Sequence, residues 1–476
     1  MSNTQAPRLP GAAPLVGGGQ DVFYAYSNIV PRPVITRAKG IYMWDEDGNQ
    51  YIDASSGPVV SNIGHGNVRV ADAMAEQAKQ MDFAYSRVAR HGPNMALTDR
   101  IARFAGPGFE RVALSSGGSE AMEIAVKFVR QYVLATGAPE RRQLLTCLPS
   151  YHGGTIATLG MSGDDALSGF FDGFGMTSHK VPAPLSYRLP GSHTLQSYTE
   201  FALAALEAKI RELGPDTVLA FTVEPVGGLA TGCVVPPVAY FQGIRDICSR
   251  HGIFLIFDEV LCGTGRGGKF LSAHHYPDAL PDIVVMAKGL GSGYAPLGAT
   301  LFPASLVDHL SALTGFNFSH TYNANPITCA TGLAVLDEYE RLNLIDNAAV
   351  MGRYLKESMR ALADEFPVIG DVRGQGLLLG VELVADPASK QSMSPEFLPT
   401  EKIRIHGLNN GLMLYSRRTA GGRYGDWFLL APPLTITKDQ CDELLRRLRA
   451  TLGDFFEDWS HETSRNRSET EPALPD

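Results

Sequence analysis

The chain has 476 residues, of which 44% are hydrophobic and 19% are charged. This composition is that of a folded globular protein and excludes a disordered chain. The 41 basic and 50 acidic residues give a formal net charge of −9, so the sequence offers no basic surface for nucleic acid or for an anionic membrane. It contains no run of about 18 apolar residues, which argues against a membrane-spanning helix.

The N-terminal segment and the cysteines point to a reducing compartment. Residues 1–20 lack the basic and then apolar pattern of a secretory signal, and we expect a loose arm there. The six cysteines contain no CxxC pair, and several lie inside apolar runs. Such cysteines are typical of buried free thiols in a reducing environment. We therefore expect a cytoplasmic protein without a metal site.

The predicted elements begin with a β-hairpin at residues 41–53, in which two alternating segments flank the turn Asp47-Gly48-Asn49. From about residue 71, helices alternate with short apolar strands. The predicted strands are 112–114, 144–148, 218–223, 254–257, 283–286 and 299–302, and the predicted helices include 120–134, 199–213 and 240–251. This alternation predicts an α/β domain with a largely parallel, buried sheet.

The chain after residue 325 has a different pattern. It is helical to about residue 366, continues in glycine-rich strands at 372–383 and 413–415, and ends in a helix at 438–452. This order predicts a smaller α+β domain. The domains that follow from it are an N-terminal arm and small-domain segment at 1–70, a large domain at 71–325, a C-terminal small domain at 326–460 and a frayed polar tail at 461–476.

Polar residues follow the predicted strands directly. Ser116–Glu120, Tyr151–Gly153, Glu224, Asp258 and Lys288 each come after the end of one strand. Each of these segments alone could be an ordinary turn. Because the carboxyl ends of parallel strands meet at one edge of a sheet, we expect the five segments to line a single ligand crevice.

Three of these segments suggest a definite chemistry. Residues 116–120 are glycine-rich and precede a helix, whose free N–H groups would suit a phosphate; the alternative is a plain N-cap by Ser119. Lys288, desolvated at a strand end, would have a lowered pKa and could form a Schiff base; the alternative is a surface lysine. Asp258 ends a buried strand and needs a cationic partner, which is either a protonated pyridine nitrogen or an arginine.

Other cofactor motifs are weak or absent. Gly263–Gly268 matches GxGxxG, but Asp258–Cys262 separates it from the strand and no helix is predicted after it, so we reject dinucleotide binding at this loop. The sequence contains no GxxxxGK[ST], HExxH or GxSxG motif, and it therefore gives no support to P-loop, zincin or α/β-hydrolase functions.

The order of these motifs is similar to that of a known family. Ser116–Glu120, Tyr151-His152-Gly153, Glu224-Pro225-Val226, Asp258-Glu259 with Lys288, and Thr321-Tyr322 together resemble the class III (ω-amino acid and ornithine-type) aminotransferases, and look closest to the ω-amino acid–pyruvate transaminases. The resemblance extends from about Val30 to about Gly453. It implies fold type I, an α/β class with a mostly parallel central sheet, and pyridoxal 5′-phosphate as the cofactor.

The resemblance also implies residue roles. Lys288 would form the Schiff base with the cofactor and move the proton, and Asp258 would pair with the pyridinium nitrogen. Val260 and Tyr151 would pack on opposite faces of the ring. The other cofactor contacts it implies are Gly117, Gly118 and Ser119 at the phosphate, His152 beside Tyr151, Glu224 near the ring hydroxyl, and Thr321 at the phosphate of the neighbouring subunit. Thr321 makes the expected assembly a homodimer with shared active sites, or a tetramer of such subunits.

Three positions depart from the family pattern. Gly117-Gly118-Ser119 replaces the commoner Ser-Gly-Ser or Ser-Gly-Thr, so the phosphate contact should depend on backbone N–H groups. Val59 stands where amine–pyruvate members often have a tryptophan that walls the substrate pocket. For the substrate carboxylate, the C-terminal segment offers Arg417, Arg418 and Arg423, and we select Arg417 because it follows the predicted strand directly.

The function implied is an enzyme that moves an amino group from an ω-amino acid, a diamine or a related amine to a keto acid, with pyruvate ahead of 2-oxoglutarate, by a ping-pong mechanism. One alternative keeps the cofactor and changes the reaction, to that of a class III decarboxylase, racemase or aminomutase. The other is a catalytically silent cofactor-binding protein, which is disfavoured because Lys288, Asp258 and Thr321 are all retained.

Overall fold

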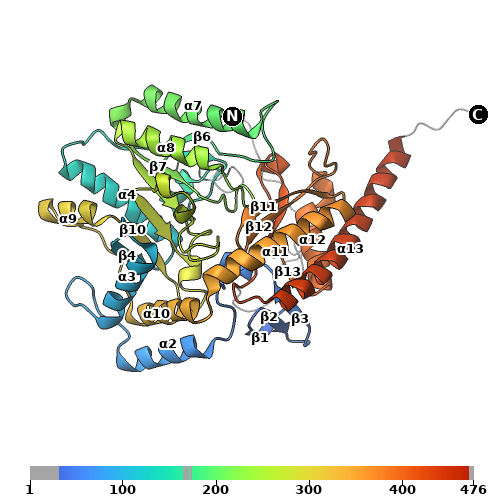
Figure 1. Ribbon diagram of the computed structural model, residues 1–476, viewed down its shortest axis with the longest axis horizontal. Helices are drawn as coiled ribbons and strands as arrows, with labels where there is room; N and C mark the ends of the chain where they lie inside the picture. Colours follow the sequence, from blue (N-terminus) through green and yellow to red (C-terminus); the bar gives the residue numbers. More distant parts are fainter. Residues whose placement is uncertain (1–31, 165–170, 172–173, 471–476) are drawn as a thin grey trace, which may run out of the picture.

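The computed structural model describes residues 32–164, 171 and 174–470, so the predicted arm at residues 1–20 lies outside the described range. Within that range the chain forms a larger body around a seven-stranded sheet and a smaller body with two four-stranded sheets (Figure 1). Every described helix is too short or too polar to span a bilayer. The six cysteines are buried and free, which confirms the expectation for their thiols.

The central sheet confirms the predicted α/β architecture. Its strands lie in the order β4-β10-β9-β8-β7-β5-β6; the pairs from β9 to β6 are parallel, and β10 is antiparallel to both of its neighbours. The strands are β4 Arg111–Ser115, β5 Gln143–Leu148, β6 His179–Pro182, β7 Val218–Val223, β8 Phe254–Asp258, β9 Ile283–Met286 and β10 Gly298–Phe302. Only β6 escaped prediction, because it is a short, polar edge strand that ends in proline, which a sheet edge accommodates.

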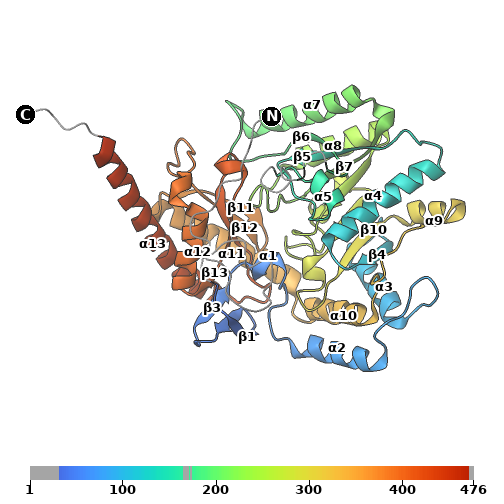
Figure 2. The same ribbon diagram turned by 180° about the vertical axis from the view of Figure 1, so that it is seen from behind.

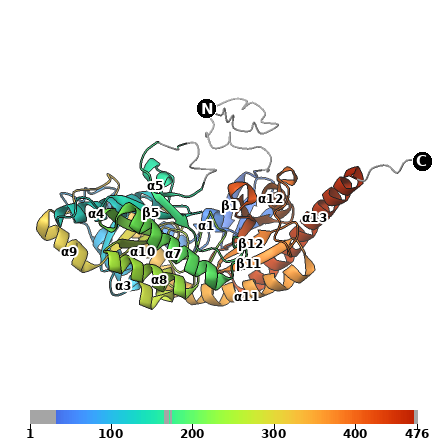
Figure 3. The ribbon, with the colours of Figure 1, turned by 90° about the horizontal axis from the view of Figure 1, so that it is seen from above.

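Helices cover both faces of this sheet (Figure 3). Leu255 and Phe257 of β8 pack into a core shared with α3, α7 and α8, whereas Ile256 faces the opposite core against α4. This alternation is the period of two that a strand buried on both sides requires. The helices of this body are α2 Val68–Gln80, α3 Gly92–Ala105, α4 Gly118–Ala135, α5 Ile156–Met161, α7 Leu195–Leu213, α8 Val238–His251, α9 Ala304–Leu313 and α10 Pro326–Arg341.

The smaller body is built from segments near both ends of the described chain. The predicted hairpin is present as β2 and β3, and β3 pairs in parallel with β13, beside which it lies in Figure 2. The second sheet is antiparallel, in the order β11-β12-β15-β14. The elements are β1 Ile35–Lys39, β2 Tyr42–Asp45, β3 Gln50–Asp53, α1 Ser56–Val59, α11 Leu344–Glu365, β11 Ile369–Gln375, β12 Leu378–Leu383, α12 Pro399–Asn409, β13 Leu412–Met413, β14 Tyr415–Arg418, β15 Asp426–Leu430 and α13 Lys438–Thr470.

The C-terminal helix α13 is longer than the sequence suggested. We expected a helix over 438–452 and a frayed tail from residue 461, but α13 continues to Thr470 and projects from the smaller body (Figure 3). Phe455 and Trp459 extend its buried face by packing on Phe397, with ring centroids 5.5 Å and 4.9 Å away. Neither glycine nor proline interrupts the chain between Asp454 and Thr470, so nothing in the polar sequence breaks the helix.

The loop Gly263–Gly268 has a structural role. A single turn at Ser272–His275 follows it, and no α-helix, in keeping with our rejection of a dinucleotide site. The buried guanidinium of Arg266 donates to the carbonyls of Leu377 (3.1 Å) and Pro432 (2.5 Å) and to Asn62 Oδ1 (2.6 Å). Burial lowers the pKa of Arg266 to about 10. The loop thus ties the larger body to both ends of the smaller one.

Candidate active site

A cavity of about 510 Å³ opens at the carboxyl ends of the parallel strands. Nine of the residues selected from the sequence line it: Gly117, Gly118, Ser119, Tyr151, His152, Glu224, Asp258, Val260 and Lys288. They come from the ends of β4, β5, β7, β8 and β9, which is the convergence that parallel strands produce. The expected single crevice is therefore present.

One end of the cavity is the N-terminus of α4. Its N-cap is Gly117, and no side chain caps the helix, so the alternative of an N-cap by Ser119 is wrong. Ser119 lies inside the first turn, where its Oγ accepts the N–H of Gly154 at 3.0 Å. A Cβ on Gly118 would lie 2.8 Å from Val260 Cγ1, so only glycine fits against that side chain. Backbone N–H groups at a positive helix end suit an anion such as phosphate.

Lys288 enters the cavity immediately after β9. Its backbone is left-handed, with φ 45°, and the half-buried side chain reaches the cavity that Asp258 and Glu224 also line. Burial lowers the pKa of the Lys288 amine to about 8, although the two carboxylates oppose this shift. A larger share of the amine is therefore neutral near neutral pH than in an ordinary lysine, and the neutral amine is the nucleophilic form.

Asp258 is buried at the end of β8 and is held by two partners. Its Oδ2 lies 2.8 Å from His152 Nδ1, and its Oδ1 accepts the N–H of Val260 at 3.1 Å. Among the described residues its ion-pair partner is this histidine and not an arginine, which disfavours the alternative of a structural pair with arginine. The buried Nε2 of His152 has no hydrogen-bond partner in the same part of the chain. The carboxylate can thus face a cation inside the cavity.

Glu224 and Tyr151 form the wall beside Asp258. Glu224 accepts the N–H groups of Gly228 at 2.9 Å and of Tyr151 at 3.2 Å. Burial raises the pKa of Glu224 to about 7, and the nearby charge of Asp258 adds to the shift. Burial also raises the pKa of the Tyr151 hydroxyl. A neutral acid and a neutral phenol can both donate hydrogen bonds at this wall.

Val59, which we selected from the sequence as a residue of the substrate pocket, does not lie where we expected it. It is 1% exposed and packs with Leu261, Cys262 and Trp427, and it does not line the cavity. Pro58 and Val60 line the cavity instead. The backbone here is irregular, with positive φ angles of 61° at Gly57 and 64° at Val59, and the Val59 side chain packs into the core.

Arg417 lies beside the cavity and not in its lining. Its guanidinium pairs with the buried Asp164 and donates to the carbonyl of Leu229 at 3.0 Å. Leu229 itself lines the cavity, so Arg417 stands just behind the wall. Arg418 pairs with Asp426 on the other side of β14, as strand alternation predicts. Thr321 is exposed and lies outside the cavity of its own chain.

Several lining residues were missed by sequence reasoning. They are mostly apolar or glycine and close the cavity from loops: Pro58, Val60, Leu229, Leu261, Ala287, Gly293, Ala295, Pro296 and Leu297. Such side chains have no titratable group that would single them out. The one available signal was the glycine- and proline-rich stretch at 291–296, directly after Lys288.

Known proteins resemble this chain along most of its length. The family model described as aminotransferase class-III matches residues 24–452. Diaminobutyrate–2-oxoglutarate transaminase of Halomonas elongata is 35% identical over 88% of this chain and 89% of its own. Hypotaurine/taurine–pyruvate aminotransferase of Paracoccus denitrificans is 34% identical over 90% and 93%, respectively. Leucine/methionine racemase of Thermococcus litoralis is 32% identical over 92% and 96%.

A solved structure has the same fold. The thermostable (S)-enantioselective ω-transaminase of Thermomicrobium roseum is 34% identical to this chain, covers 92% of it and 96% of its own length, and superposes with a TM-score of 0.83. The match extends over both bodies, so the assignment to fold type I is confirmed.

Proposed function

This chain belongs to the class-III aminotransferase family, and we propose that it transfers an amino group from an ω-amino acid, a diamine or a related amine to a keto acid by a ping-pong mechanism. As in its family, the cofactor is pyridoxal 5′-phosphate. One observation carries the proposal: the amine of Lys288 and the buried carboxylate of Asp258 line the same cavity, whose far end is the uncapped start of α4.

The residues present fit the cofactor. Its phosphate would meet the backbone of Gly117–Ser119, its ring would lie between Val260 and Tyr151, and its ring nitrogen would face Asp258. When bound, the cofactor supplies an electron sink for the carbanion chemistry of transamination. The Asp258 carboxylate would be the counter-ion of the ring nitrogen, and His152 holds that carboxylate in place through the 2.8 Å contact of Nδ1 with Oδ2.

Lys288 would attach the cofactor and then move the substrate proton. A lysine does this efficiently when its pKa is near the working pH, because it must alternate between neutral and charged forms. Burial brings the pKa of Lys288 to about 8. The apolar residues around the mouth, Pro58, Val60 and Leu229 among them, would exclude water from the reacting groups.

Arg417 is the residue that we propose for the carboxylate of the keto acid. In a ping-pong reaction the same cavity accepts an amine and then a keto acid, which differ in charge. An amine without a carboxylate would leave the pair of Arg417 with Asp164 intact. The keto acid would instead compete with Asp164 for the guanidinium, which binds a carboxylate in a bidentate fork.

A donor panel on the holoenzyme tests the proposed reaction. With pyruvate as acceptor, we expect β-alanine, taurine or diaminobutyrate to yield alanine, and pyruvate to outperform 2-oxoglutarate. The alternative reactions have different signatures: a decarboxylase releases carbon dioxide without a keto acid, and a racemase or aminomutase converts its substrate without an acceptor. The racemase among the relatives makes these controls necessary. Product formation that needs no keto acid would contradict transamination.

Removing the Arg417 guanidinium should change the KM for the keto acid and leave the KM for the amine nearly unchanged. We expect Arg417→Ala to raise the KM for pyruvate by about tenfold or more, since a charge-assisted contact is lost. The KM for an amine donor without a carboxylate should change little. Steady-state kinetics with both substrates measures the split.

Arg423→Ala is the matched control for this variant. Arg423 was the rival candidate from the sequence, but it is exposed and lines a different cavity. We expect it to leave the KM for pyruvate unchanged. An equal loss for both substrates in Arg417→Ala would indicate folding damage, and a raised KM for pyruvate in Arg423→Ala would move the carboxylate contact there.

We also propose a homodimer with shared active sites. Thr321 is followed in the chain by the exposed Tyr322, whose ring centroid lies 6.3 Å from that of the exposed Phe83, and Phe318 close by in the sequence is also exposed. An exposed apolar surface of this kind is typical of an interface. A second copy placed there would bring Thr321 toward the partner's phosphate site.

The buried free thiols are in keeping with a cytoplasmic location.

Thr321→Ala should weaken cofactor binding and dimerisation together. The lost hydroxyl would contact the phosphate across the interface, and a single hydrogen bond to a charged group accounts for about tenfold in affinity. Added cofactor should also stabilise the dimer by mass action. Sedimentation with and without cofactor measures both effects. Thr314→Ala, at an exposed threonine whose hydroxyl bonds Gln131, is the control. A cofactor-saturated monomer would contradict the shared site.

A further inference from the structure

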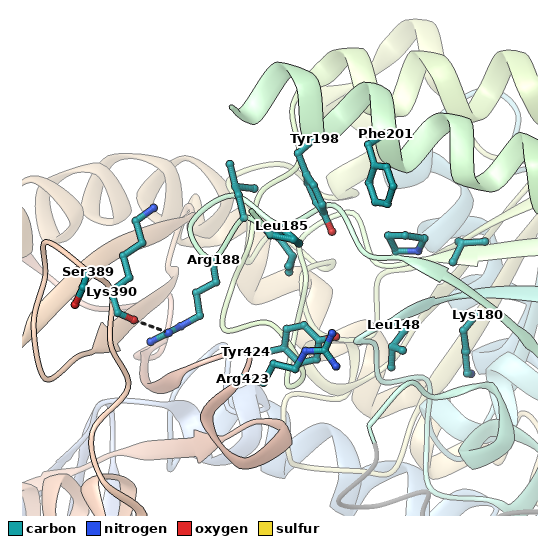
Figure 4. Close-up of a pocket in the computed structure, with 14 residues that line it drawn as sticks. Leu148, Lys180, Leu185, Arg188, Tyr198, Phe201, Ser389, Lys390, Arg423 and Tyr424 are labelled. Carbon is teal, nitrogen blue, oxygen red and sulfur yellow. Dashed lines mark hydrogen bonds between the residues drawn. The ribbon is translucent and has the colours of Figure 1, made fainter. Parts of the chain in front are cut away.

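A second cavity, of about 660 Å³, lies between the two bodies, and no described residue lines both it and the cavity of Lys288 (Figure 4). On one side it is lined by β6, the segment after it and α7. On the other side, residues 389–390 and 423–424 of the smaller body line it. Nothing in the proposed transamination uses these residues.

The polar lining of this cavity is cationic. Lys180, Arg188, Lys390 and Arg423 contribute to it, and among the described residues no aspartate or glutamate lines it. Within the described part of the chain, Lys390 and Arg423 form no ion pair. Lys390 Nζ donates to the carbonyl of Tyr187 at 2.8 Å, and the exposed guanidinium of Arg423 lies 5.3 Å from the ring centroid of Tyr424. Among the residues that the structure describes, these two positive charges therefore have no neutralising carboxylate at the cavity.

Arg188 adds a buried donor to the same lining. It pairs with Glu382 through Nε and donates from Nη1 to the carbonyl of Lys390 at 2.7 Å, the contact that is dashed in Figure 4. Its Nη2 is buried and has no hydrogen-bond partner among the described residues. An unpartnered buried N–H group costs free energy unless a ligand or water accepts it. This donor and the two unpaired cations all favour an anion.

The opposite wall is apolar. Leu148, Leu185, Tyr198 and Phe201 line it, and in Figure 4 Tyr198 and Phe201 descend from α7. Tyr198 donates its hydroxyl to the carbonyl of Ala183 at 3.0 Å and is 3% exposed, so its ring forms the packed base of this wall. Phe201 is 44% exposed, and its ring centroid lies 5.8 Å from that of Tyr198. An apolar molecular body would bury the exposed part of Phe201 against this wall.

We propose that this cavity binds an organic anion, in which a carboxylate or phosphate group is carried on an apolar or aromatic body. The anionic group meets Arg423, Lys390 and Arg188, and the body packs on the wall formed by Leu185, Tyr198 and Phe201. An amine is repelled by the uncompensated charges, so the cavity is not a second site for the amine donor. Because its walls belong to both bodies, a bound anion links residues 389–390 and 423–424 to α7.

Calorimetric titration of the holoenzyme tests this proposal with three probes. 4-Phenylbutyrate and phenyl phosphate carry the two anionic groups on similar bodies, and 4-phenylbutanamide is the neutral control. We expect saturable binding of at least one anion, undiminished by saturating pyruvate, and binding of the amide at least about tenfold weaker because the charge-assisted contacts are lost. The comparison of the two anions identifies whether carboxylate or phosphate is preferred.

Variants locate the binding. Arg423→Ala should weaken anion binding by about tenfold, and Phe201→Ala should weaken both anions through lost apolar contact. Both residues are exposed, so folding is not at risk. Arg353→Ala, at an exposed arginine of α11 outside both cavities, should have no effect. The proposal is overturned if no anion binds, if the amide binds equally well, if pyruvate displaces the anion, or if Arg423→Ala leaves the affinity unchanged.

Discussion

Lys288→Ala is expected to abolish turnover while the cofactor remains bound. The proposed phosphate site at Gly117–Ser119 and the carboxylate of Asp258 do not depend on the lysine amine, so affinity should fall far less than activity. We expect a loss of at least about 10⁴-fold in kcat, because covalent attachment and proton transfer are removed together. Cofactor titration and single-turnover rates measure the two effects separately. Lys288→Arg, which keeps a charge but has no nucleophilic amine, should be equally inactive.

Borohydride reduction identifies the attachment point directly. The purified holoenzyme should be yellow, and reduction followed by peptide mass mapping should find the cofactor fixed to Lys288. Lys269 is exposed in the neighbouring loop, and Lys269→Ala should keep both colour and turnover. A reduced adduct on Lys269 or Lys127 would contradict the assignment of Lys288.

The pH dependence of attachment follows from the environment of Lys288. The neutral amine is the reactive form, and burial lowers its pKa from 10.5 to about 8. In the cofactor-free protein the attachment rate should therefore rise with pH and level off above about pH 8, whereas an ordinary lysine would still be gaining neutral amine up to its own pKa. Stopped-flow absorbance on both sides of pH 8 measures the midpoint. A midpoint near 10.5 would mean that the lysine is solvated.

The catalytic end of the cavity could be predicted because each of its residues follows an apolar strand. Strand periodicity located β7, β8 and β9, and the parallel order then required Glu224, Asp258 and Lys288 to meet. Reactive side chains at the ends of strands can be recognised from the sequence alone. That they lie close together follows from the parallel order of the strands and does not depend on the paths of the loops.

The substrate end could not be predicted in the same way. Its residues lie on loops whose direction depends on backbone torsions, and Val59, with a φ of 64°, lies in the core while its neighbours Pro58 and Val60 line the cavity. Arg417 was found at its strand end, but its partner Asp164 lies far away in sequence and no local pattern joins them. The second cavity, with its cationic lining, could not be predicted for the same reason, since Lys390 and Arg423 come from two separate loops of the smaller body.

Asp258→Asn is expected to slow the donor half-reaction by about 10³-fold, the size of effect seen when one preorganised electrostatic contact to a developing charge is removed. Asparagine has the size of aspartate and can still accept the N–H of Val260 through Oδ1, so packing should persist. It carries no charge, and the ring nitrogen of the cofactor then loses the anion that keeps it protonated. Asp258→Glu keeps the charge and should be milder. Rapid-mixing absorbance without keto acid isolates this half-reaction.

A cofactor analogue methylated at the ring nitrogen distinguishes charge from packing at Asp258. Its nitrogen is permanently positive and needs no carboxylate, so Asp258→Asn loaded with the analogue should regain much of the lost rate. Glu224→Gln is the matched control, because Glu224 is a second carboxylate at the same cavity and its loss should not be rescued. Near-normal rates of Asp258→Asn with the ordinary cofactor would move the charge role to another group. Failure of the analogue to rescue a variant that binds it would leave Asp258 with a positioning role alone, exerted through His152.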